Sequence, residues 1–137
     1  LSRRTEDIDL ADEVPAEVRT QHDLLEHLAQ RYGLRLAHFQ SHYLPAGWQD
    51  RLHSFGSFGR LQVFLVDAGD IFVGKLFSAR EKDRDDLRVL AAQLDKAILT
   101  DRLHRSAASL RAESQLREHA EKNWYILYGE PLPTAAQ

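Results

Sequence analysis

The 137-residue chain contains no cysteine and no methionine. Without cysteine, the chain has neither a disulfide framework nor thiolate chemistry. No apolar run approaches the roughly 20 residues of a membrane span, and the opening residues lack the apolar segment of a signal peptide. Internal repeats and low-complexity blocks are also missing. These absences predict a cytoplasmic globular protein without a membrane partner.

The chain also lacks a large excess of positive or negative charge. The sequence carries 18 Lys and Arg against 21 Asp and Glu, a net charge of −3. This balance gives no overall electrostatic case for nucleic-acid binding, although a local basic groove can still form. The seven histidines do not have zinc-site spacing: His38 and His42 lie roughly 13 Å apart on an extended strand. No P-loop and no Gly-x-Ser-x-Gly pattern is present.

Strands are predicted mainly in the first half of the chain. Alternation of polar and apolar residues predicts a strand over residues 5–10. A helix is predicted next, with Pro15 in its first turn and Gly33 at its end. A second strand covers 34–43, a turn 45–47, and a compact apolar run makes 61–66 a central strand. The glycine-rich segment 54–59 looks like a phosphate-binding loop, but no helix-opening lysine follows it. We therefore expect a flexible hairpin connection or a mobile flap there.

The second half is predicted to be helical. Asp70 can cap one helix and Asp83 the next, and Thr100 or Asp101 can begin a third. Leucine and alanine recur at helical spacing as far as Leu127. The predicted fold class is α+β, with a small mixed β-sheet followed by a helical C-terminal half. We expect one domain over residues 1–130 and a flexible tail over 131–137.

Two aspartates near the start of the chain carry the clearest chemical signal. On an extended strand Asp7 and Asp9 project from the same face, because side chains alternate with a period of two. Burying two carboxylates side by side is costly unless a cation lies between them. A divalent ion such as Mg²⁺ takes hard oxygen ligands and often binds substrate phosphates as well. A solvated acidic terminus is the structural alternative.

Several short motifs occur in a characteristic order along the chain. They are Arg4-Thr5-x-Asp7-Ile8-Asp9, Leu44-Pro45-x-Gly47-Trp48-x-x-Arg51, Asp70-Ile71-x-x-x-Lys75-Leu76, Arg80-x-Lys82-Asp83-x-x-Asp86-Leu87 and Asn123–Glu130. In this order they resemble small bacterial nucleotidyltransferase-like proteins of the DNA polymerase β superfamily. That group is uncharacterised and is distantly similar to abortive-infection-type toxin nucleotidyltransferases. The resemblance implies a nucleotidyltransferase-type sheet and possible membership of a toxin–antitoxin system.

The resemblance also implies roles for particular residues. Asp7 and Asp9 would hold Mg²⁺ (or Mn²⁺) and act as catalytic carboxylates, and Lys75 would steady the triphosphate. Asp83 and Asp86 are further catalytic candidates, and both also fit plain helix-start acids. Arg4 and Arg80 are candidate nucleotide-binding residues. An ordinary lysine at a helix boundary is the structural alternative for Lys75.

Two parts of the expected site have no counterpart in the sequence. The superfamily places a glycine turn before the Asp-x-Asp strand, so we expect an opening helix and this turn to precede Leu1. Sites of this superfamily usually add a third carboxylate from a neighbouring strand, but the strand predicted over 34–43 contains no acid. We expect Asp83 or Asp86 to fill that position, or the position to be absent and any transfer to be slow.

The predicted function is transfer of a nucleoside monophosphate from a nucleoside triphosphate to an acceptor. An RNA end, a protein hydroxyl and a small molecule all remain open as acceptors. The alternative is a non-catalytic nucleotide-binding module or an antitoxin-type module with a protein partner.

Overall fold

Two paired strands form the described part of the N-terminal unit. The computed structural model describes residues 7–11, 27, 30–31, 35–39, 43–59 and 61–133, and it divides the chain into Leu1–Ser41 and His42–Gln137. In the first unit, β1 (Asp7–Ala11) pairs in parallel with β2 (Arg35–Phe39). Both strands lie where the sequence predicts strands, although β2 is shorter. The helix predicted between them lies almost wholly outside the described residues.

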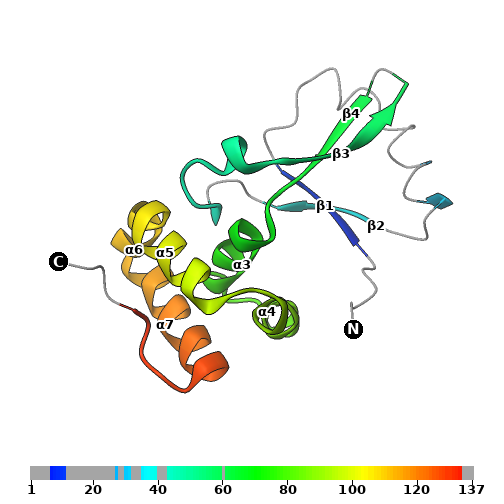
Figure 1. The fold of residues 1–137 in the computed structure, drawn as a ribbon. Helices are drawn as coiled ribbons and strands as arrows, with labels where there is room; N and C mark the ends of the chain where they lie inside the picture. Colours follow the sequence, from blue (N-terminus) through cyan, green and yellow to red (C-terminus); the bar gives the residue numbers. More distant parts are fainter. Residues whose placement is uncertain are drawn as a thin grey trace. The chain divides into compact units, whose positions relative to one another are not determined.

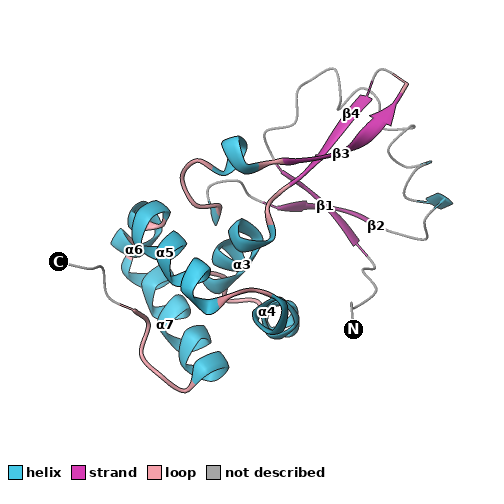
Figure 2. Ribbon diagram, in the orientation of Figure 1, coloured by secondary structure: helices cyan, strands magenta, loops and turns pink. Residues whose placement is uncertain are grey.

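An antiparallel hairpin opens the described strands of the second unit (Figure 2). It consists of β3 (His53–Phe58) and β4 (Leu61–Leu65), with Gly59 in the turn at φ 64°. The hairpin expected around residues 54–59 is confirmed, but residues 54–58 belong to its first strand and do not form a flexible connection or flap. Aromatic residues favour a strand here, and the irregular register between Ser54 and Gly56 accommodates the glycine. The apolar run predicted to be a strand is confirmed as β4, which pairs with β3 alone among the described strands; its central position stays a prediction.

The turn predicted at 45–47 is confirmed, and it leads into a short 3₁₀ helix, η2 (Trp48–Arg51). Gly47 has φ 82°, a left-handed conformation that favours glycine. A side chain at this position would also begin 3.0 Å from the Arg51 guanidinium. Arg51 in turn donates a 2.9 Å hydrogen bond to the carbonyl of Ala46, which holds the turn closed.

Helices make up most of the described chain after β4 (Figure 1). They are α3 (Ala68–Leu76), α4 (Glu81–Gln93), α5 (Lys96–Ser106), α6 (Ala108–Ala112) and α7 (Ser114–Tyr128). Helix α3 contacts α4, α5 and α7, and most of its residues are buried. The α+β class is confirmed. Its described strands form one parallel and one antiparallel pair, where we predicted a small mixed sheet.

Three helices begin at residues other than those predicted. Asp67 caps α3 by accepting a hydrogen bond from the backbone of Gly69, and Asp95 caps α5 in the same way through Ala97. Helix α4 follows Arg80, which makes no side-chain cap, so Asp83 lies inside its first turn. Asp70 and Asp83 are instead committed to ion pairs. At α3 and α5 more than one residue satisfies the local capping preference, and the sequence alone does not decide among them.

The core of the second unit is formed by one cluster of buried apolar side chains. Its largest members are Trp124, Phe72 and Phe77, all fully buried, and the Trp124 and Phe72 rings meet edge to face. Leu132 also belongs to this cluster, and the Arg111 guanidinium donates to the carbonyl of Pro133. The first residues of the predicted flexible tail therefore pack on the helices, whereas 134–137 lie outside the described residues.

Candidate functional site

The predicted metal-binding pair lies on β1. Asp7 is opposite Arg35 of β2, and Asp9 is opposite Ala37. Their separation of two positions on one strand is the arrangement that the sequence predicted. The side chains of β1, and Arg4 altogether, lie outside what the structure describes. The metal-binding role of Asp7 and Asp9 stays a prediction.

A second group of predicted residues lies together where α3 meets α4. The Lys75 ammonium lies 3.0 Å from Asp83 Oδ1 and 3.1 Å from Asp86 Oδ2. The side chains of Lys75 and Asp83 are only 9% and 3% exposed, whereas that of Asp86 is 34% exposed. Buried charges need partners, and this arrangement supplies them. The structure therefore joins three separately predicted residues in one cluster, the Lys75 cluster.

Two residues that the sequence analysis missed support this cluster. Ser78 donates a 2.7 Å hydrogen bond to Asp83 Oδ2, and its hydroxyl accepts one from the backbone of Arg80. Asn123, from α7, is buried and donates to the carbonyls of Leu76 and Ser78. These bonds fix the segment that connects α3 to α4. Asn123 opens one of the motifs noted in the sequence, but no spacing rule connects it to residues almost fifty positions away.

Burial and ion pairing act in opposite directions on Lys75. Burial alone would lower the pKa of its ammonium, but the charges and hydrogen bonds of Asp83 and Asp86 outweigh it and raise the pKa above the ordinary value. Lys75 therefore carries its charge throughout the physiological range. Both carboxylates engage the Lys75 ammonium, so this lysine is not an uncommitted cation for a phosphate.

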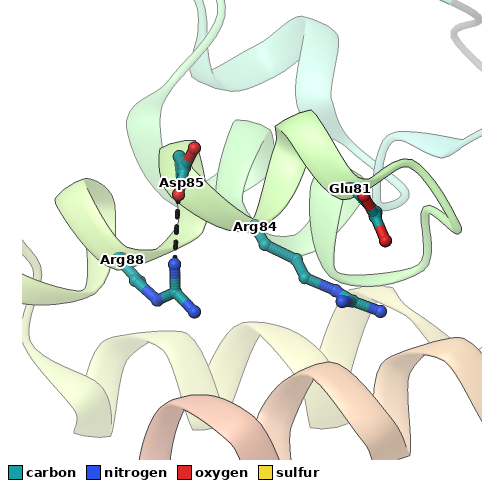
Figure 3. Close-up of a pocket in the computed structure, with 4 residues that line it drawn as sticks. All are labelled: Glu81, Arg84, Asp85 and Arg88. Atoms are coloured by element: carbon teal, nitrogen blue, oxygen red, sulfur yellow. Dashed lines mark hydrogen bonds and ion pairs between the residues drawn. The ribbon is translucent and has the colours of Figure 1, made fainter.

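Arg80 lies beside the cluster and is exposed at the start of α4. An exposed arginine next to a helix N-terminus is available to an anionic ligand, as its predicted nucleotide-binding role requires. Further along the same helix, Glu81, Arg84, Asp85 and Arg88 line an open depression, in which Arg88 pairs with Asp85 at 3.0 Å (Figure 3). Two acids and two arginines balance there, and we assign this depression no ligand.

A third charged group connects η2, β3, α3 and α5. Asp70 is fully buried and accepts two 2.8 Å hydrogen bonds from the Arg51 guanidinium. Arg102 pairs with Asp67 and lies 3.5 Å from Asp70, and His53 contacts Asp67 at 2.8 Å. Arg51 and Asp70 each belong to a motif noted in the sequence, but nothing there indicates that they pair.

The Asp67 carboxyl responds to these partners. Its partial burial would raise its pKa, but the hydrogen bonds from His53 and Arg102 lower the pKa below the ordinary value, as does the backbone donor of Gly69. An added Cβ at Gly69 would collide with the Arg102 guanidinium, so the glycine permits this close approach. The ion pairs and hydrogen bonds of Asp67 and Asp70 therefore fix the N-terminus of α3.

Among the described residues, no group of three or more potential ligands lies close enough to hold a metal. No described helix is both long and apolar enough to cross a membrane. That Asp83 or Asp86 supplies a third carboxylate beside Asp7 and Asp9 stays a prediction.

Comparison with protein families matches residues 1–129 to a family described as nucleotidyltransferases of unknown function (DUF6036). The chain belongs to this family. The match extends over β1, the Lys75 cluster and all of α7. It supports a nucleotidyltransferase-like protein and, at the level of the family, nucleotidyl transfer as the reaction type. No curated protein and no solved structure matches the chain.

Proposed function

We propose that this protein binds a nucleoside triphosphate with Mg²⁺ or Mn²⁺ through Asp7 and Asp9 and transfers the nucleoside monophosphate to an acceptor. The observation that carries the proposal is the match of residues 1–129 to a nucleotidyltransferase family. The Asp-x-Asp pair of that matched segment lies on a strand, where two carboxylates are spaced for a shared cation. The acceptor remains open among an RNA end, a protein hydroxyl and a small molecule.

The donor chemistry of the pair fits the cation. Mg²⁺ and Mn²⁺ favour carboxylate oxygens and bind through one or two carboxylates together with substrate phosphates. Asp7 and Asp9 supply two carboxylates within three consecutive residues of β1. When bound, the ion would offset the charge that develops on the entering and leaving oxygens.

The remaining groups have defined tasks in the proposed reaction. The acceptor oxygen attacks the α-phosphorus, pyrophosphate leaves, and the acceptor proton passes to a carboxylate or to solvent. Asp83 and Asp86 are the candidate proton acceptors, and Arg4 and Arg80 are the candidate nucleotide contacts. The resemblance implies a nucleotide contact for Lys75 as well, although its ammonium is paired with two carboxylates. If the protein belongs to a toxin–antitoxin system, this transfer would be the reaction of the toxin, and the antitoxin would be its protein partner.

Thermal unfolding with and without ligand tests the proposal. Mg²⁺ or Mn²⁺ together with one of the four nucleoside triphosphates should raise the melting temperature, because a ligand that binds only the folded state stabilises it. At 100 times the Kd this stabilisation amounts to about 2.7 kcal/mol. Asp7→Asn with Asp9→Asn should abolish the shift and leave the unliganded melting temperature nearly unchanged.

Asp101→Asn is the matched control, because Asp101 is an exposed acid on α5 that pairs only with Arg105 among the described residues. This variant should keep the full shift. A shift that survives in the double variant would place the metal site elsewhere. Transfer of label from an α-labelled nucleotide to an acceptor then separates an enzyme from a module that binds nucleotide without turnover.

A further inference from the structure

One face of α4 carries four charged side chains of alternating sign. Glu81, Arg84, Asp85 and Arg88 follow one another at helical spacing and line the same open depression (Figure 3). We call these four residues the α4 charged face. Their order along the helix is acid, arginine, acid, arginine, and this order determines what the face can bind.

The charges of this face are poorly satisfied within α4 itself. Residues four apart on a helix are neighbours, and here they carry like charges, Glu81 with Asp85 and Arg84 with Arg88. Asp85 pairs with Arg88 at 3.0 Å, but both side chains are more than half exposed, and a surface pair of this kind is weak. Glu81 and Arg84 have no ion-pair partner among the described residues. The face can therefore exchange its few internal contacts for contacts with a partner.

Antiparallel pairing of this face with its own copy would satisfy all four charges. A two-fold axis that passes between positions 84 and 85 places Arg84 opposite Asp85 of the partner subunit. The same axis places Glu81 opposite Arg88 of the partner subunit, and by symmetry each contact forms twice. The order acid, arginine, arginine, acid would instead oppose like charges. Self-complementarity is therefore a specific property of the order found here.

A narrow, partly apolar groove borders the α4 charged face. It is lined by Arg84, Leu87, Arg88, Asn123, Ile126 and Leu127. The side chain of Ile126, from α7, is 43% exposed. In a two-fold pair of α4 helices, α7 of both copies lies on the same side, so Ile126 of each copy adds apolar area to the interface. Apolar contact of this kind supplies favourable free energy that exposed ion pairs alone do not provide.

We propose that this protein forms a two-fold dimer through the α4 charged face. A second copy is the occupant because it matches both signs of charge, whereas a phosphate or an acidic peptide would meet Glu81 and Asp85 as like charges. This inference goes beyond the proposed function, since it involves neither the metal-binding pair of β1 nor a nucleotide. Exposed ion pairs are individually weak, so we expect a dissociation constant in the micromolar range.

Sedimentation equilibrium of the full chain over a range of concentrations tests the proposal. The mass should rise toward twice that of one chain, and the affinity should fall as the ionic strength approaches about 1 M, where the Debye length is about 3 Å. Arg84→Glu opposes acids, and Asp85→Arg opposes arginines, at both symmetry-related contacts. Each should weaken the dimer at least about 10-fold. The double variant Arg84→Glu with Asp85→Arg restores opposite charges and should recover the wild-type affinity.

A mixture of the two single variants gives a second test of the same geometry. Neither variant should associate well with itself, but each carries the charges that the other needs at positions 84 and 85. The equimolar mixture should therefore form a heterodimer with nearly wild-type affinity. Mutual rescue between chains requires that the two positions meet across the interface.

Matched controls make the same charge changes on another helix. Arg105→Glu and Asp101→Arg alter the exposed ion pair of α5 and should leave the association unchanged. Circular dichroism and the melting temperature show whether each variant folds. Glu81→Arg, with rescue by Arg88→Glu, repeats the experiment at the outer contact if a variant at position 84 or 85 does not fold.

Three results would overturn the proposal. The first is a protein that remains a monomer up to about 1 mM. The second is a dimer that the α4 variants do not weaken, because its interface then lies elsewhere. The third is failure of both the double variant and the mixture to recover affinity, which excludes the two-fold register.

Discussion

Arg51 and Asp70 illustrate how a single pair of residues can hold several elements in place. Asp70 has no exposed surface, while the Arg51 side chain is 28% exposed. Their two parallel hydrogen bonds form the bidentate arrangement that is strongest for arginine and carboxylate. Breaking a buried pair by removing one partner leaves the other charge uncompensated. The unequal burial therefore predicts unequal effects of the two single substitutions.

Arg51→Met should cost about 3–5 kcal/mol of unfolding free energy, because it leaves a fully buried carboxylate without its main cation. Asp70→Asn should cost less, about 1–3 kcal/mol, since the partly exposed guanidinium can turn toward water. Urea denaturation measures both values. The exposed pair of Arg105 and Asp101 is the matched control, and Asp101→Asn should change the stability by less than about 0.5 kcal/mol. Equal costs for Arg51→Met and Asp70→Asn would contradict the argument from burial.

At the scale of the elements, the N-terminus of α3 depends on an ionised cap. Asp67 accepts the backbone donor of Gly69 and pairs with Arg102 and His53. Its pKa is lowered in the folded state, so its contribution to stability is present above the unfolded pKa of about 3.9. That contribution is lost as the pH falls through the folded value.

Asp67→Asn tests this cap because asparagine caps a helix nearly as well as aspartate but carries no charge. We expect the variant to be less stable than the wild type near pH 7 and to approach it as the pH falls below about 4. Asp95→Asn makes the same change at the cap of α5, where the described residues offer no ion pair, and should have a smaller effect. Chemical denaturation at several pH values measures the difference. A stability gap at Asp67 that does not vary with pH would contradict the ionic explanation.

Local sequence patterns predict the presence of the helices and strands more accurately than the residues at which they begin. Alternation in β1, the apolar run of β4 and the leucine spacing of the helices depend on neighbouring residues, and those predictions hold. The starts of α3 and α5 differ from the predicted ones because each segment offers more than one residue that can cap, and α4 begins after Arg80 without any side-chain cap. Arg51 engages Asp70 and Lys75 engages Asp83, and neither contact is visible in the local sequence.

The candidate site shows the same division. Lys75, Asp83 and Asp86 could be named from the sequence, but their pairing depends on the packing of α3 against α4. Ser78 and Asn123 were missed because a serine after a helix and an asparagine within one carry no chemical signal of their own. Side-chain contacts over 45 and 47 positions arise only in the folded chain.

At the scale of the whole molecule, the described core belongs to one unit. Every residue of the buried apolar cluster lies between Phe72 and Leu132, inside His42–Gln137. The ion pair of Arg51 with Asp70 and the ion pair of Lys75 with Asp83 lie in the same unit. Hydrophobic burial is the main favourable contribution to folding. The second unit therefore has a hydrophobic core and buried ion pairs of its own.

We expect a fragment of residues 42–137 to unfold cooperatively, with a helical circular dichroism spectrum, and to show no melting shift with Mg²⁺ and nucleotide because it lacks Asp7 and Asp9. A shorter fragment, residues 67–137, is the informative control. It keeps the buried members of the apolar cluster but loses Tyr43, which packs against them, and Arg51, the main partner of Asp70. It should be less stable than the longer fragment by at least about 3 kcal/mol, because breaking a buried pair costs about that much and the packing of Tyr43 is lost as well. Thermal and urea unfolding of both fragments measure this difference. If residues 42–137 fail to fold alone, the unit depends on residues 1–41. If both fragments are equally stable, the pairing of Arg51 with Asp70 contributes little to this unit.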